Sequence, residues 1–106
     1  MTTFTNKETE ITSANEAGTA LTKLTYADLA VLCLNAKEAQ ASFTIEEMGA
    51  RLPIITALKS CTTTGEIELE SMQLAKLKTQ VEYMSTKWQF MHADVLAFDT
   101  YIKSLK

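Results

Sequence analysis

The sequence is poor in the residues from which catalytic and metal-binding motifs are built. Its 106 residues include one histidine, two cysteines and three glycines. The glycines, Gly18, Gly49 and Gly65, are too far apart to form a GxGxxG or Walker loop. Cys33 and Cys61 match neither a CxxC motif nor a zinc-site spacing. We therefore predict no bound nucleotide, no metal and no cofactor.

Basic residues and long apolar runs are also scarce. The nine lysines and single arginine, Arg51, are scattered, and the net charge is −3. Because nucleic-acid-binding proteins usually carry a basic patch, direct binding to DNA or RNA is disfavoured. The longest apolar run, residues 29–34, is shorter than the ~18 residues of a membrane span. No signal peptide is evident in residues 1–10, so we expect a cytoplasmic protein with reduced cysteines rather than a Cys33–Cys61 disulfide.

The overall composition predicts one small globular domain. Hydrophobic residues make up 46% of the chain and charged residues 22%, close to globular averages. Residues 1–20 are rich in threonine and glutamate and have few large apolar side chains, which predicts a polar arm that is flexible or ordered by a partner. A marginal first helix is the alternative for this arm. Residues 21–106 are predicted to form a single helical domain.

Four segments have the charge polarity of helices. Acidic groups favour the first turn of a helix and basic groups the last, and this order occurs four times. Thr25 with Asp28 and Thr44 with Glu47 have the spacing of capping boxes. The fold is therefore predicted to be all-α, a compact bundle of about four helices. The predicted helices are residues 26–37, 45–60, 70–86 and 93–105.

Apolar residues at intervals of three and four predict the buried faces of these helices. The first helix is apolar nearly all round and should be the most buried. A two-stranded coiled coil of the third helix is an alternative to packing within the chain, and a homo-oligomer would cover all stripes easily. The stripes are Ile45, Met48, Leu52 and Ile55; Leu74, Leu77, Val81 and Met84, with Trp88 in phase; and Met91, Val95, Phe98, Ile102 and Leu105.

Two local features interrupt the helical pattern. Apolar and charged residues alternate over 66–69, which predicts a short extended segment after the loop at residues 62–65. Pro53 lies inside the second predicted helix, where it predicts a kink near residues 49–53. Two short helices, with Pro53 in the first turn of the second, are the alternative.

His92 is the only candidate for acid–base chemistry. With Asp94 or Asp99 it would form a pair that could orient a general base. No nucleophile motif accompanies it, and its position at a predicted helix start is more typical of a surface or capping histidine. We therefore predict no catalytic residue and no enzymatic activity.

Aromatic and methionine side chains near the end of the third helix predict a partner-binding surface. The same cluster is also typical of the end of a hydrophobic core. The glutamates that precede the third predicted helix are included among the candidate partner-binding residues because an acidic surface suits a basic partner. The alternatives are that these glutamates only favour the start of the helix or that they bind a divalent cation. The candidate partner-binding residues are Glu66, Glu68, Glu70, Tyr83, Met84, Trp88, Phe90 and Met91.

The order of segments in the second half resembles a known group of proteins. FTIEEMGARLPIITALK is followed by a turn, then by IELESMQLAKLKTQVEYM, KWQF and HADVLAFDTYI. Over residues 43–102 this is similar to small uncharacterised helical accessory proteins of tailed bacteriophages. The resemblance implies a protein that acts through protein contacts in the host cytoplasm or the virion, and it assigns no functional residue.

The sequence therefore predicts a non-enzymatic protein–protein interaction module. Its role would be that of a virion or assembly component, or of an inhibitor of a host or defence factor. The alternative is a small dimeric regulator that binds nucleic acid. That regulator would need a basic face, for which Lys76, Lys78 and Lys87 are the only candidates.

Overall fold

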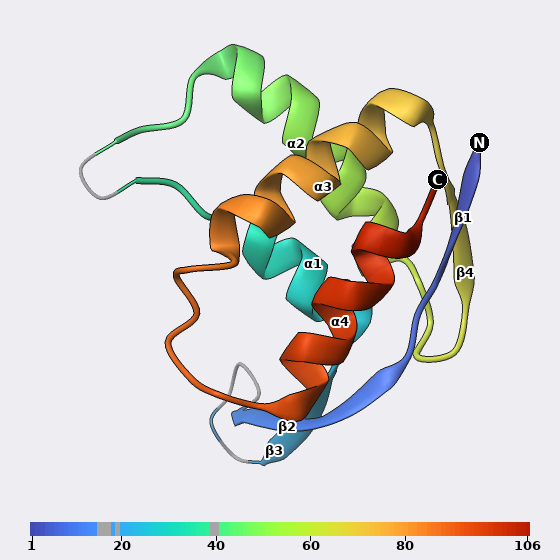
Figure 1. The fold of residues 1–106 in the computed structure, drawn as a ribbon, viewed down its shortest axis with the longest axis vertical. Helices are drawn as coiled ribbons and strands as arrows, with labels where there is room; N and C mark the ends of the chain where they lie inside the picture. Colours follow the sequence, from blue (N-terminus) through green and yellow to red (C-terminus); the bar gives the residue numbers. More distant parts are fainter. Residues whose placement is uncertain (15–17, 19, 39–40) are drawn as a thin grey trace.

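The computed structural model describes residues 1–14, 18, 20–38 and 41–106 of the chain. Within them α1 lies at the centre of the molecule, with α2, α3 and α4 around it (Figure 1). The four predicted helices are confirmed to within a few residues. Their bounds are Tyr26–Leu34 for α1, Ile45–Lys59 for α2, Ser71–Met84 for α3 and Ala93–Ser104 for α4.

Two small antiparallel sheets make the fold α+β, so the prediction of an all-α helical bundle with a polar arm is wrong. β1 (Thr2–Thr5) pairs with β4 (Glu66–Leu69), and β2 (Glu8–Ala14) pairs with β3 (Leu21–Thr25). The segment predicted as an arm therefore contains two strands. Its residues 15–17 and 19 lie outside the described residues. The extended segment expected at residues 66–69 is β4.

Side-chain alternation explains why the N-terminal segment folds as strands despite its low hydrophobic content. Successive side chains of a strand point to opposite faces, so one apolar residue in two is enough to reach a core. Phe4 is fully buried and Ile11 is 8% exposed, while their neighbours in sequence face solvent. The abundant threonines are β-branched and favour strands. Composition alone suggested disorder because it does not register this two-residue period.

Asn6 holds the bend between β1 and β2 against the rest of the fold. Its side-chain Oδ1 accepts a hydrogen bond from the N–H of Ala27 in α1 (2.8 Å), and its Nδ2 donates to the carbonyl of Thr62 (2.9 Å). Its backbone N–H donates to the carbonyl of Gly65 (2.9 Å). Because Asn6 is only 4% exposed, these bonds compensate for the loss of water around a buried amide.

The helix starts follow the predicted capping residues, with one difference. Thr25 and Asp28 form the expected reciprocal capping box at α1. At α2 the Thr44 hydroxyl accepts the N–H of Glu47 (3.0 Å), but the Glu47 carboxylate turns to basic side chains instead of back to Thr44. α2 is one continuous helix through Pro53, so the alternative of two short helices is wrong. The kink at Pro53 remains a prediction.

The core surrounds α1 and confirms the predicted buried faces of α1, α3 and α4, except that Met91, predicted in the α4 stripe, is 99% exposed. The stripes of α3 and α4 bury Leu74, Leu77, Val81, Val95, Phe98 and Ile102, and α1 is buried on most sides. The α2 stripe is wrong for three of its four residues: Ile45, Met48 and Leu52 are 82%, 40% and 53% exposed, and only Ile55 is buried. Only the second half of α2 packs on the core, through Ile54, Ile55 and Leu58. The first half extends beyond the body of the molecule (Figure 1).

Both cysteines are free thiols, so the alternative of a Cys33–Cys61 disulfide is not what the structure contains. Cys33 lies in the core, and burial, with a smaller contribution from the charge of Asp99, raises its pKa to about 12. α2, the longest described helix, has 15 residues, and no helix in the described part of the chain has the length and hydropathy needed to cross a membrane.

Candidate functional site

Four of the predicted partner-binding residues come together where α3 passes into α4. Met84 ends α3, and Trp88, Phe90 and Met91 follow in the connection to α4. Phe90 is 42% exposed and Met91 is 99% exposed, whereas Met84 and Trp88 pack partly against the core. A 99% exposed methionine gains nothing from this fold alone, which makes the connection the strongest candidate for a contact surface.

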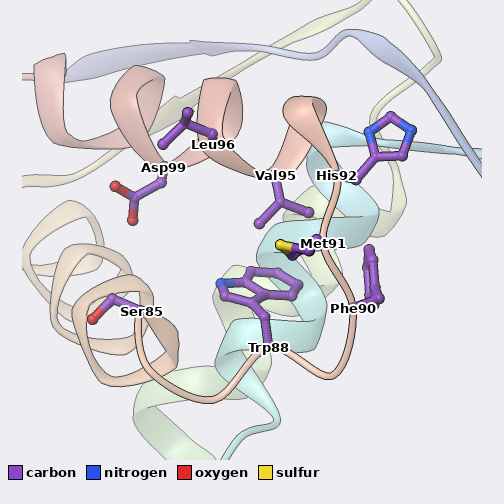
Figure 2. A pocket seen from close by; sticks show the side chains of 8 residues that line it. All are labelled: Ser85, Trp88, Phe90, Met91, His92, Val95, Leu96 and Asp99. Atoms are coloured by element: carbon purple, nitrogen blue, oxygen red, sulfur yellow. The ribbon is translucent and has the colours of Figure 1, made fainter.

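An open hollow of about 250 Å³ lies between this connection and α4. Figure 2 shows the Trp88 ring on the side of the connection, with Val95 and Asp99 facing the hollow from α4. The indole nitrogen of Trp88 points to the side where Ser85 and Asp99 lie. The lining residues are Ser85, Trp88, Phe90, Met91, His92, Val95, Leu96 and Asp99. The hollow is therefore apolar over most of its wall, with one carboxylate.

Trp88 and Phe90 form a ridge between this hollow and a second one. Their ring centroids are 5.9 Å apart in an edge-to-face arrangement, with an interplanar angle of 78°. The second hollow, of about 330 Å³, adds Leu32 of α1, which is 45% exposed. Leu96 of α4, on the far side of the first hollow, is 70% exposed. We call Leu32, Trp88, Phe90, Met91 and Leu96 together the Trp88 surface.

Acidic groups border the Trp88 surface on the α4 side. Lys103 lies 3.1 Å from carboxylate oxygens of both Asp99 and Glu82, so one ammonium serves two carboxylates. These carboxylates raise the pKa of Lys103. The second oxygen of Asp99, Oδ1, is buried and has no hydrogen-bond partner among the described residues. The edge of the hollow therefore carries negative charge that the chain itself does not fully neutralise.

His92 caps α4, as one of the two interpretations of its position predicted. Its Nδ1 accepts a hydrogen bond from the N–H of Asp94 at 3.0 Å, which places the side chain as the N-cap of α4. The Asp94 carboxylate in turn accepts the N–H of Glu10 in β2 at 2.8 Å. His92 thus caps α4, and Asp94 joins the start of α4 to β2.

The structure separates the predicted acidic residues from the aromatic ones. Glu66 and Glu68 lie on β4 and Glu70 caps the start of α3, with all three exposed. The 14 residues of α3 put about 20 Å between them and the Trp88 surface, at ~1.5 Å per residue. Tyr83 is half-buried, with Lys87 Nζ 4.4 Å from its ring centre, and does not line either hollow.

Sequence reasoning missed two residues of the Trp88 surface. Leu32 lies inside a helix predicted to be buried all round, and only the packing of the other helices decides which side of it stays open. Leu96 had a signal: it is an apolar residue of α4 that falls outside the stripe formed by Val95, Phe98 and Ile102. Apolar residues off the buried stripe of a helix are candidates for contact surfaces.

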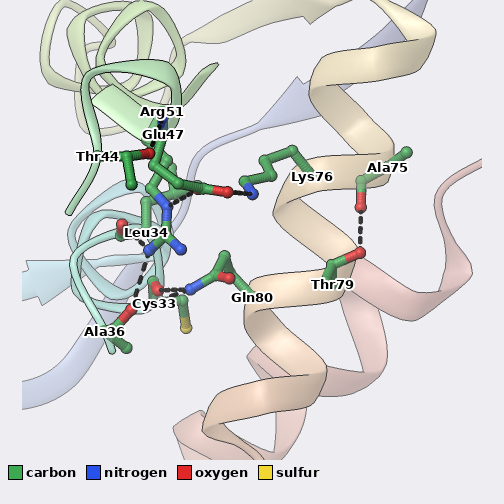
Figure 3. A network of polar contacts seen from close by, with 10 residues as sticks. All are labelled: Cys33, Leu34, Ala36, Thr44, Glu47, Arg51, Ala75, Lys76, Thr79 and Gln80. Carbon is green, nitrogen blue, oxygen red and sulfur yellow. Dashed lines mark hydrogen bonds and ion pairs between the residues drawn. The ribbon is translucent and has the colours of Figure 1, made fainter. Parts of the chain in front are cut away.

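A second cluster of polar residues surrounds Arg51, and its contacts join elements of the fold (Figure 3). Arg51 Nη1 donates to the carbonyls of Leu34 and Ala36 at 2.9 Å each, at the end of α1. Its Nε lies 2.8 Å from Glu47, which also binds Lys76 at 2.8 Å. These two partners lower the pKa of Glu47. Carbonyls at a helix end lack partners within the helix, and Arg51 supplies them here.

Gln80 of α3 adds to the same arrangement. It is 5% exposed, and its Nε2 donates to the carbonyls of Cys33 (3.0 Å) and Ala36 (3.2 Å). α1 has no basic residue in its last turn, so α2 and α3 provide the donors that this end of the helix dipole favours. The Arg51 cluster therefore joins three helices, and among the described residues none of its buried side-chain polar atoms lacks a hydrogen-bond partner.

Two of the three lysines proposed for a basic face are engaged within the chain. Lys76 pairs with Glu47, and Lys78 donates to the carbonyl of Leu105. Lys87 lies over the ring of Tyr83. In the described residues no three His, Cys, Asp or Glu side chains approach closely enough to hold a metal ion.

Comparison with known proteins adds no relative. No protein-family model matches the sequence, no curated protein matches it, and no solved structure matches its fold.

Proposed function

We propose that this protein is a non-enzymatic interaction module that binds a partner protein through the Trp88 surface. The exposure of Met91, together with that of Phe90 and Leu96 around one hollow, carries the proposal. Interaction hot spots are typically aromatic and methionine side chains beside a pocket, surrounded by a polar rim. Trp88 and Phe90 supply rigid aromatic area, and Met91 adapts its shape to a partner.

The resemblance to phage accessory proteins suggests where such a partner would be found. As a phage-encoded protein it would work in the host cytoplasm or in the virion. The partner would then be a virion or assembly protein, or a host or defence factor that the module inhibits. Both roles need only a surface of suitable shape and charge, which the Trp88 surface offers.

The test is a binding measurement with a matched pair of variants. Met91→Ser/Leu96→Ser removes exposed apolar area from the Trp88 surface, and Met48→Ser/Leu52→Ser removes it from α2. A partner recovered by the wild-type chain is identified, purified and titrated against all three. We expect Met91→Ser/Leu96→Ser to weaken binding at least ~10-fold, as for hot-spot residues, and the α2 variant to bind like the wild type.

A stability control accompanies this measurement. Because Met91 and Leu96 are exposed, their replacement should change the free energy of unfolding by less than about 0.5 kcal/mol in urea titrations. Equal binding by the wild type and Met91→Ser/Leu96→Ser would refute the proposal. So would an equal loss in both double variants, since that would place the contact outside the Trp88 surface.

Self-association through α2 is a second candidate function, favoured by the exposed face of Ile45, Met48 and Leu52. Two α2 helices packed antiparallel would bury these faces and bring Glu46 at the start of one helix near Lys59 at the end of the other. Opposite charges at the two ends of one helix favour an antiparallel pair. Three side chains cover less than the ~800 Å² per partner of a stable interface, so the dimer would be weak.

Light scattering at two protein concentrations tests the second candidate. We expect the mass of the wild type to rise toward that of a dimer with concentration, and Met48→Ser/Leu52→Ser to remain monomeric. Met91→Ser/Leu96→Ser should behave like the wild type. A monomeric wild type at both concentrations, or a dimer that persists in the α2 variant, excludes an α2 dimer.

A further inference from the structure

The hollow of the Trp88 surface combines an aromatic ring with a carboxylate, and the combination selects for one kind of partner. The Trp88 ring and Asp99 line the same hollow from opposite sides, the connection and α4 (Figure 2). An aromatic face attracts a cation, and a carboxylate attracts it more strongly still. The rest of the wall is apolar, so the cation must come on a segment that also carries apolar side chains.

Negative charges outnumber positive charges at the α4 edge of the hollow. Glu82 and Asp99 share the single ammonium of Lys103, which leaves one negative charge uncompensated at this edge. Asp94 lies nearby at the start of α4 and accepts a backbone N–H rather than a cation. Lys87 lies beyond the Trp88–Phe90 ridge, where it lines the second hollow.

Asp99 can accept a partner's cation at the oxygen that Lys103 now binds. Its side chain is 24% exposed and its Oδ2 lies 3.1 Å from Lys103 Nζ, whereas its Oδ1 is shielded from solvent and has no partner among the described residues. A partner's cation would therefore replace Lys103 beside Oδ2. Lys103 is 47% exposed and has a second partner in Glu82, so it can release Asp99 without losing all of its pairing.

We propose that the Trp88 surface binds an amphipathic segment of a partner protein that places a lysine or arginine beside Asp99 and apolar side chains against Trp88, Met91 and Leu96. This inference rests on the proposed function and names the chemistry of its partner. A second copy of this chain fits the hollow poorly, because Glu46 is exposed at the start of its α2 helix. That carboxylate would meet the acidic edge of the hollow.

Trp88 is the only tryptophan, so its fluorescence reports directly on the hollow. The probes are three synthetic amphipathic helical peptides with the same leucine stripe and with lysine, glutamine or glutamate at one position beside it. Each is titrated into the wild type, into Asp99→Asn and into Glu82→Gln. Glu82→Gln is the matched control, because it also alters the pairing of Lys103 but leaves the carboxylate in the hollow.

We expect the wild type to bind the lysine peptide about 5-fold more tightly than the glutamine peptide, and the glutamate peptide most weakly. Asp99→Asn should bind the lysine and glutamine peptides equally, with unchanged affinity for the glutamine peptide. Glu82→Gln should keep most of the preference for the lysine peptide. Added salt should reduce the preference because it screens charge.

Several outcomes overturn the inference. Equal affinity of the lysine and glutamine peptides for the wild type would do so, as would an equal effect of Asp99→Asn and Glu82→Gln or no fluorescence change with any peptide. The proposed function is decided separately, because the Met91→Ser/Leu96→Ser titration with the identified partner requires no cation beside Asp99. A partner that binds through the Trp88 surface with full affinity for Asp99→Asn would keep the function and remove the inference.

Discussion

The Arg51 cluster and the Trp88 surface both include residues of α1, but their polar and apolar side chains have opposite roles. Arg51, Glu47 and Gln80 bring charged and amide groups together, yet their donors end on helix carbonyls or on each other. The Trp88 surface leaves Phe90 and Met91 exposed and one carboxylate oxygen of Asp99 without such a partner among the described residues. In this chain the clustered polar residues therefore stabilise the fold, whereas the exposed apolar side chains form the candidate binding surface.

The largest expected effect comes from removing the arginine. Arg51→Met leaves the carbonyls of Leu34 and Ala36 without their donor and Glu47 with only Lys76. Two hydrogen bonds from a charged group are lost, so the free energy of unfolding in urea titrations should fall by about 2–3 kcal/mol. The peptide affinity of the Trp88 surface should stay at the wild-type value in native buffer.

Arg51→Lys separates charge from geometry in this test. A lysine keeps the positive charge but lacks the planar fork that reaches two carbonyls and Glu47 together. We expect it to recover less than half of the stability that Arg51→Met loses. Full recovery by lysine would mean that the charge alone holds the cluster, and a loss of Trp88 binding in either variant would show that the two regions are not independent.

A smaller effect is expected from acid. The Arg51 and Lys76 side chains lower the pKa of Glu47, so the folded state favours its ionised form. The resulting stabilisation is present above the unfolded-state pKa of glutamate, about 4.3, and is lost as pH falls through the lower folded-state value. In unfolding titrations between neutral pH and pH ~3, wild type should lose more stability than Glu47→Gln. Parallel pH profiles would contradict this.

The helices were predictable because their signals are local. Charge polarity at both ends, the Thr25–Asp28 capping box and spacing by three and four all lie within one segment, and they located α1 to α4 to within a few residues. The strands were missed because their evidence is not local. Phe4 becomes a core residue through β4, more than 60 residues away along the chain, and through Tyr101 of α4, which is more distant still.

The candidate site was predictable in part for the same reason. Trp88, Phe90 and Met91 are adjacent in sequence, and their clustering was visible. Leu32 joins them only through the packing of α1 against α3, and the Glu66–Glu70 segment was grouped with them although α3 holds it apart. The α2 stripe failed because periodicity identifies an apolar face but not the element that covers it, and for Ile45 none of the described residues does.

The pairing of β1 with β4 has a consequence for how the chain folds. Thr2 lies opposite Leu69, so this sheet closes a loop of more than 60 residues, whereas each helix forms from neighbours in sequence. Closing a long loop lowers the entropy of the chain before stabilising contacts form, so contacts between residues far apart in sequence form slowly during folding. We infer that the helices assemble first and that the N-terminal strand, with Phe4 and Asn6, docks last onto the packed helices.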